Sequence, residues 1–194
     1  MAYDGNPPTN RTGAGAIGGK PAESLCTSCH GGTAVNVGGS VEIIGLPAAY
    51  VPGVAYDLTV RVTSGQTAAN SGRLWGFELT VVEGINGNGT GTLANISGQG
   101  TSTAAGTGNF TTRSYVRSNS GNHSGAASPV DWQVRWTAPD PAPGPVHLFF
   151  TGVAANGASG ANGDWTYTGN VVIPQASTGV QGSTWSGVKA LFVH

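Results

Sequence analysis

The sequence predicts an all-β sandwich of antiparallel strands, preceded by an irregular N-terminal segment. Apolar and polar residues alternate with a period of two in several stretches, and clusters of Gly, Pro, Asn and Ser separate these stretches. Glycine accounts for 33 of the 194 residues, whereas only 9% of residues are charged. About eight or nine short strands at this spacing favour a sandwich over a helical fold.

The N-terminal segment, residues 1–39, is predicted to be an extended arm. Residues 1–20 are rich in Pro and Gly, which disfavour regular structure. A short helical turn is expected over residues 22–25, and it would carry Cys26 and Cys29 on one face. This is the only helix that the sequence predicts.

The sandwich is expected over residues 40–173, followed by a C-terminal extension over residues 174–194 with a final strand. Alternation is clearest from Val130 to Trp136, and Gly76 is a candidate β-bulge. We expect Trp75, Trp132, Trp136 and Trp165 to fill the core, whereas Trp185 lies in the extension. One predicted strand, 188–193, lies in the extension, and 146–153 is almost continuously apolar. The predicted strands of the sandwich cover residues 41–44, 56–62, 75–81, 91–96, 110–117, 130–136, 146–153, 164–167 and 171–173.

The two cysteines of the chain lie in the stretch Cys26-Thr27-Ser28-Cys29-His30. The spacing Cys-x-x-Cys-His is the attachment signal for c-type haem. Both thiols can form thioethers with the haem vinyl groups, and the histidine is then held as an axial iron ligand. The sequence therefore predicts one covalent haem on Cys26 and Cys29, with His30 as the proximal ligand.

Other interpretations of this motif are weaker. A redox dithiol of the thioredoxin type would need a βαβ pattern, which the sequence lacks. A structural zinc site needs four ligands, and the motif supplies three at most. A disulfide between Cys26 and Cys29 would close a very small loop and stabilise little. Zinc binding and dithiol chemistry stay as the alternatives.

Charge and hydropathy argue against nucleic-acid binding and against a transmembrane helix. The net charge is −1 without a basic block, which argues against nucleic-acid binding. No stretch of about 20 apolar residues predicts a transmembrane helix. The first residues do not form a signal peptide, yet c-type haem is attached outside the cytoplasmic membrane. We therefore interpret the chain as a mature exported protein of the extracellular space or cell surface, with the periplasm as an alternative.

Several short segments stand in a characteristic order over about residues 8–173. In chain order they are Arg11-Thr12-Gly13-Ala14, Cys26 to Gly31, Tyr50 to Tyr56, Trp75 to Leu79, His123-Ser124, Trp132 to Pro139, Gly144 to Phe150, Ala154 to Gly157, and Gly163-Asp164. In this order they resemble the bacterial and archaeal Reeler-like β-sandwich domains that begin with a c-haem motif, the choice-of-anchor V type. The resemblance implies an exported immunoglobulin-like sandwich that carries haem, here a monohaem extracellular cytochrome.

The sixth ligand of the iron is the main open choice. We expect His123, because it lies where the Reeler-like domains show a histidine ahead of the Trp-x-x-x-Trp strand. The alternatives are His147, His194 and Met1, in the same chain or from a neighbouring subunit. A second histidine ligand would favour electron transfer, whereas an open iron site would bind small molecules.

The leading hypothesis is a non-enzymatic cytochrome that exchanges electrons with a redox partner protein or with other haem subunits. The second is a structural subunit of an extracellular filament or surface layer, because a terminal strand such as 188–193 could add to a neighbour's sheet and give a homo-oligomer. The third is a haem protein that binds gases. Surface N-glycosylation is a further possibility, since five Asn-x-Ser/Thr sequons occur, at Asn10, Asn88, Asn95, Asn109 and Asn122.

Overall fold

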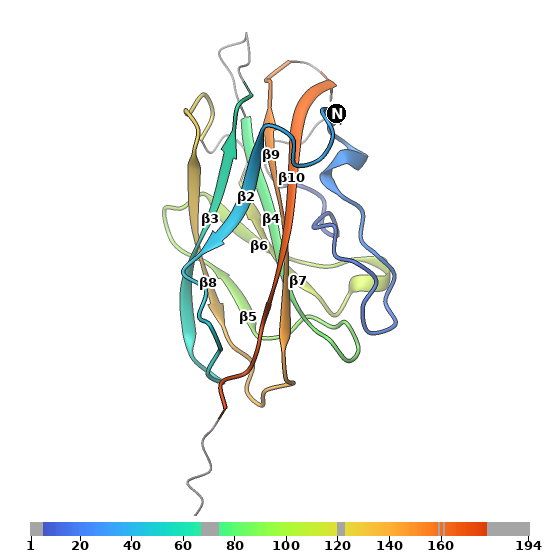
Figure 1. Ribbon diagram of the computed structural model, residues 1–194, viewed down its shortest axis with the longest axis vertical. Coiled ribbons are helices and arrows are strands. Elements are labelled where there is room, and N and C mark those ends of the chain that lie inside the picture. Colours follow the sequence, from blue (N-terminus) through green and yellow to red (C-terminus); the bar gives the residue numbers. More distant parts are fainter. Residues whose placement is uncertain (1–5, 67–73, 120–122, 159, 161, 178–194) are drawn as a thin grey trace, which may run out of the picture.

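The computed structural model describes residues 6–66, 74–119, 123–158, 160 and 162–177, and it shows two β-sheets packed face to face (Figure 1). The six-stranded sheet has the order β1 (Gly31–Gly32), β10 (Asn162–Ile173), β9 (Val146–Ala155), β4 (Leu74–Glu83), β7 (Ser114–Ser118) and β6 (Thr101–Ala105). The four-stranded sheet has the order β2 (Gly39–Ile44), β3 (Ala55–Ser64), β8 (Val130–Thr137) and β5 (Thr92–Asn95). The predicted all-β sandwich is confirmed.

Neighbouring strands are antiparallel except at the edge where β1 runs parallel to β10. The alternate residues of β4 and β8 that the sequence places inside are buried between the sheets, with Trp132 and Trp136 both 0% exposed. The Phe77 ring lies 4.9 Å from that of Trp132. Trp165 packs against this core and is partly buried, and Trp185 lies outside the described residues.

Two local predictions near the motif are wrong. Residues 22–25 are extended, because Leu25 pairs with Thr12 in an antiparallel bridge, and the helical turn is instead a 3-10 helix at η1 (Cys26–Ser28). Gly76 is not a bulge, since it pairs with Val153 in a register that runs unbroken from Leu74 to Glu83. In the part of the chain described here, no helix has the length and apolarity needed to cross a membrane.

The middle of the chain also differs from the prediction. Residues 101–105 form β6, which was not expected, and η2 (Gly108–Phe110) occupies the start of the strand predicted at 110–117. The two short strands expected after residue 163 are one strand, β10. Met1, His194 and the predicted strand 188–193 lie outside the described residues.

The N-terminal arm covers the outer face of the six-stranded sheet, the face turned away from the other sheet. Figure 1 shows the arm in blue along this side of the sandwich. Polar residues of β4, β9 and β10 that would otherwise meet solvent are buried there, among them Glu78 and Thr151 at 0% and Asp164 at 2% exposure. The arm thus encloses a polar layer outside the apolar core, and the motif lies in this second layer.

Candidate functional site

The residues of the Cys-x-x-Cys-His motif share one cleft on the outer face of the six-stranded sheet. The cleft is partly open to solvent, and the space that it encloses is about 20 Å³. Its walls are largely apolar. The lining residues come from the arm and from the adjacent ends of β4 and β9, and they are Pro7, Pro8, Arg11, Cys26, Cys29, His30, Gly76, Phe77 and Val153.

The 3-10 turn orients the two thiols differently. The backbone amides of Cys29 and His30 both donate to the carbonyl of Cys26, at 3.0 and 2.9 Å. Cys26 points inward and is 6% exposed, whereas Cys29 is half-buried at the cleft. The motif therefore presents one buried sulfur and one accessible sulfur to the same space.

Cys26 is held against β9. Its sulfur lies 3.2 Å from Thr151 Oγ1, and its side chain packs with Val153 and Ala155. Burial raises the pKa of the Cys26 thiol to about 12. A thiol in this state is a poor nucleophile, since dithiol exchange depends on a thiolate with a lowered pKa. The burial makes Cys26 itself a poor attacking thiol for dithiol exchange in the folded protein.

His30 forms a buried pair with Asp164 of β10. Its Nδ1 lies 2.7 Å from Asp164 Oδ2, and the two residues are 4% and 2% exposed. Because the carboxylate can only accept, Nδ1 donates this hydrogen bond. The other carboxylate oxygen, Oδ1, accepts a bond from the Asn156 backbone amide at 2.9 Å. The orientation of the imidazole is therefore fixed by a carboxylate that is itself held in place.

The backbone after the motif is fixed to the same strand. Gly32 of β1 pairs with Asp164, and a Cβ on Gly32 would come within 2.1 Å of the Asp164 carbonyl oxygen. Only glycine allows this approach. The close pairing and the His30 side chain thus both anchor the motif to the start of β10.

Sequence reasoning did not identify Asp164 as part of the site. Asp164 stands in a resembling segment, Gly163-Asp164, but 134 residues separate it from His30. A local pattern cannot show such a contact. In the described ranges, no group of three or more His, Cys, Asp or Glu is arranged to hold a metal ion, so the zinc interpretation gains no further ligand.

His123 lies at the same end of the sandwich as the cleft. Its loop follows the end of β7, where Ser118 Oγ accepts a bond from the Phe77 amide at 3.2 Å, and Phe77 lines the cleft. The His123 ring is half-buried and meets the Trp132 ring edge-on, with 5.0 Å between the centroids. His123 is not among the described residues that line the cleft. Two ring contacts lie between them, because His123 contacts Trp132, and Trp132 contacts Phe77 at the cleft.

His147 lies at the opposite end of the sandwich. It is near the start of β9, pairs with Val82 and Val172, and stacks on Phe149. Val153 in the cleft lies six positions further along the strand, at a distance of about 20 Å. His147 of the same chain therefore cannot complete a coordination that includes His30.

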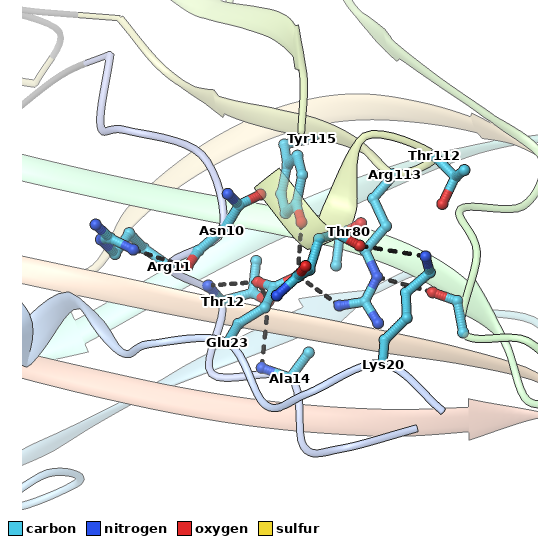
Figure 2. A network of polar contacts seen from close by, with 12 residues as sticks. Asn10, Arg11, Thr12, Ala14, Lys20, Glu23, Thr80, Thr112, Arg113 and Tyr115 are labelled. Carbon is cyan, nitrogen blue, oxygen red and sulfur yellow. Dashed lines mark hydrogen bonds and ion pairs between the residues drawn. The ribbon is translucent and has the colours of Figure 1, made fainter. Parts of the chain in front are cut away.

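Beneath the arm, Glu23 is the centre of a buried polar network (Figure 2). Its Oε1 accepts bonds from Arg113 Nη1 at 2.5 Å and from the Tyr115 hydroxyl at 2.6 Å. Its Oε2 accepts from the Thr12 hydroxyl at 2.6 Å. Both members of the Glu23–Arg113 pair have fully buried side chains. This network fixes the arm three residues ahead of Cys26.

A second buried carboxyl group, that of Glu78, lies close to Cys26. Glu78 is directly opposite Thr151 in the β4–β9 register, and Thr151 contacts the Cys26 sulfur. Its Oε2 accepts a bond from the Arg11 amide at 2.8 Å, while its Oε1 has no partner within the described residues. Burial raises the pKa of Glu78 to about 8.

Comparisons with known proteins give similarity in structure only. No family model and no curated protein sequence matches the chain. The Reelin-N domain of F-spondin is similar at a TM-score of 0.45 and 16% identity, over 78% of this chain and 95% of that one. The human F-spondin reeler domain gives 0.42 and 18%, over 76% and 96%. A cohesin of Acetivibrio cellulolyticus scaffoldin B gives 0.37 and 8%, over 68% and 98%.

Proposed function

We propose that the chain is an exported monohaem c-type cytochrome that transfers electrons and catalyses no reaction of its own. Cys26 and Cys29 attach the haem covalently, and His30 is the proximal ligand of the iron. The haem supplies one-electron iron chemistry when bound, and the protein supplies attachment, orientation and exclusion of water.

The observation that carries this proposal is the buried pair of His30 and Asp164. Metal-ligating histidines commonly donate their second ring N–H to a carboxylate, which fixes the ring and increases its basicity. Asp164 lies in that relation to His30, at 2.7 Å and away from solvent. A solvated surface histidine would not need such a partner.

The remaining residues of the cleft fit the same group. Its walls are largely apolar, as the surroundings of a porphyrin should be, and Phe77 and Val153 contribute to them. Cys26, Cys29 and His30 all border the cleft. The Cys26 side presents a buried attachment point and Cys29 a more accessible one.

For the sixth ligand we propose His123, at the same end of the sandwich. In the structure its ring packs on Trp132, so binding the iron requires the loop that carries it to turn toward the cleft. His194 and Met1, which lie outside the described residues, are the alternatives, as is a histidine of a neighbouring subunit. An open sixth position would instead make the protein a binder of gases or other small ligands.

A structural subunit of an extracellular filament is the second candidate function. It is favoured by exposed apolar side chains near the point where β10 ends: Val51, Val54 and Val172 are 48%, 40% and 51% exposed. Residues 174–176 continue from there along Tyr50. Val172 pairs with His147, so this end lies opposite the cleft, and association through it would not involve the haem site. Light scattering of the purified protein across a concentration series tests this directly.

The attachment is tested by producing the chain in a host that matures c-type cytochromes. Haem should stay with the polypeptide after denaturation and acid extraction, and Cys29→Ala should lose much of this retention. Thr27→Ala, an exposed position within the same motif, is the matched control. Complete release of haem from the unaltered protein would refute covalent attachment.

The ligand assignment is tested on the same material by spectroscopy. His123→Ala should convert a six-coordinate low-spin iron to a high-spin one that binds carbon monoxide, whereas His147→Ala should not. A high-spin, carbon monoxide-binding spectrum in the unaltered protein would support the third candidate, ligand binding, over electron transfer.

A further inference from the structure

The sequons of the chain occupy very different environments in the structure. Asn10 is 9% exposed, and its side-chain amide donates to the Thr107 hydroxyl at 2.8 Å and to the Thr107 carbonyl at 3.2 Å. Thr12, the hydroxyl residue of the same sequon, is fully buried and bonded to Glu23. A glycan on Asn10 would prevent the arm from docking on the sheet.

Asn88 is also engaged. Its amide nitrogen lies 3.3 Å from Glu83 Oε1, and its carbonyl oxygen accepts a bond from the Thr112 hydroxyl at 2.7 Å. A sugar on this nitrogen would displace the Glu83 contact and crowd the loop that these bonds close. The fifth sequon, at Asn122, lies outside the described residues.

Asn95 and Asn109 are different. Both side chains are exposed, and so are the hydroxyl residues of their sequons, Ser97 and Thr111. Asn95 ends β5, and Asn109 lies within η2, shortly after β6. Both therefore present an accessible amide together with the hydroxyl that the sequon requires.

We infer that Asn95 and Asn109 are N-glycosylation sites of the exported protein, whereas Asn10 and Asn88 are not. The sugar donor is an oligosaccharide linked to a polyprenyl phosphate or diphosphate. The bond between the anomeric carbon and the phosphate oxygen breaks, and a bond between that carbon and the asparagine Nδ2 forms. The amide loses one proton, the lipid phosphate is the leaving group, and nothing is oxidised or reduced.

The positions of the two sites have a consequence for assembly. β5 is the last strand of the four-stranded sheet, and β6 is the last strand of the six-stranded sheet. Exposed edge strands pair readily with other chains, and proteins protect them with bulky or charged groups. Glycans beside β5 and β6 would shield one open side of the sandwich and direct any self-association to other surfaces.

The inference depends on export but not on haem, so it can fail while the proposed function holds, and the reverse is also possible. The test is peptide mapping by mass spectrometry of the protein purified from its own source. Glycan masses are expected on the peptides that contain Asn95 and Asn109, and unmodified Asn10 and Asn88 are expected.

Matched variants separate the sequon from the asparagine itself. Ser97→Ala and Thr111→Ala should each remove one glycan mass while leaving Asn95 and Asn109 in place, and Asn88→Gln should leave the glycan mass unchanged. An unmodified Asn95 or Asn109 in the exported protein overturns the assignment of that site. A glycan on Asn10 or Asn88 overturns the structural criterion by which the sites were separated.

Discussion

Replacing Asp164 by Asn removes the negative charge that faces His30 and leaves the shape of the side chain nearly unchanged. The carboxylate accepts two hydrogen bonds, from His30 Nδ1 at 2.7 Å and from the Asn156 amide at 2.9 Å. The amide of the variant can keep an oxygen toward Asn156 but then presents an NH₂ group to the His30 N–H. The charge-assisted bond is lost in either case: the His30 N–H has no acceptor, or its proton moves to Nε2 and Nδ1 accepts a weaker bond between neutral groups.

The structure gives the size of the effect. His30 and Asp164 are 4% and 2% exposed, so solvent does not weaken their interaction. A hydrogen bond to a charged group contributes about 1.5–3 kcal/mol, and a buried donor without a partner incurs a desolvation cost of similar size. We expect Asp164→Asn to lower the free energy of unfolding by about 2–3 kcal/mol.

Urea denaturation followed by tryptophan fluorescence measures this change, and Asp57→Asn is the control. Asp57 pairs with Arg135 on the exposed surface, so its replacement should leave the unfolding midpoint nearly unchanged. In the haem-loaded protein the same Asp164→Asn change should raise the midpoint potential, because a neutral partner makes the His30 ligand less basic.

The free energy of unfolding and the midpoint potential test different roles of Asp164. Wild-type stability in Asp164→Asn would refute the buried pair itself. Reduced stability with an unchanged potential would show that the pair is structural and that Asp164 does not position an iron ligand.

Three further predictions concern the layer beneath the arm. Burial raises the pKa of Glu78 from 4.5 to about 8, so between these pH values the folded protein retains a proton that the unfolded chain has lost. The free energy of unfolding should therefore fall as the pH rises from about 4.5 to about 8 and level off above it. Urea titrations of Glu78→Gln should lack this pH-dependent contribution. Glu23→Ala should reduce the free energy of unfolding by about 3–5 kcal/mol, because it leaves the buried Arg113 charge without its partner. Replacement of the exposed Glu42 by Ala is the control. Equal denaturation midpoints for the Glu23→Ala and Glu42→Ala variants would contradict the network. Gly32→Ala should detach β1 from β10, and hydrogen exchange of the Asp164 amide should become faster. The control is Gly15→Ala, because a Cβ at Gly15 meets no atom within 4 Å. Equal exchange rates in the two variants would show that the pairing is not close.

The inner layer of the fold follows from the sequence because its signal is local. Val130 to Trp136 alternate with a period of two, and such alternation decides which side of a strand is buried whatever lies beyond it. The same reasoning assigns the opposite side to solvent, and there it fails. Glu78 is 0% exposed because a segment more than 60 residues earlier covers it, and no pattern within β4 shows this.

The candidate site, like the fold, has one part that the sequence predicts and another that it does not. The residues Cys26, Cys29 and His30 are contiguous, so their spacing alone predicts their chemistry. Asp164 acts through a contact that exists only after β10 has been placed beside the arm. The turn over residues 22–25 was placed wrongly for a related reason, since the bridge between Thr12 and Leu25 keeps this stretch extended.

The polar character of the second layer bears on how the motif is oriented. An apolar arm could slide along an apolar sheet at little cost, because hydrophobic burial has no direction. The arm here is held by charged and hydrogen-bonded partners on both sides of the motif, Glu23 with Arg113 before it and His30 with Asp164 at its end. A shift by even one residue would leave these buried groups unpaired, at a cost of several kcal/mol each. The sandwich therefore acts as a template that sets the depth of Cys26 and the direction of the His30 ring, which a five-residue motif in an otherwise irregular arm could not set for itself.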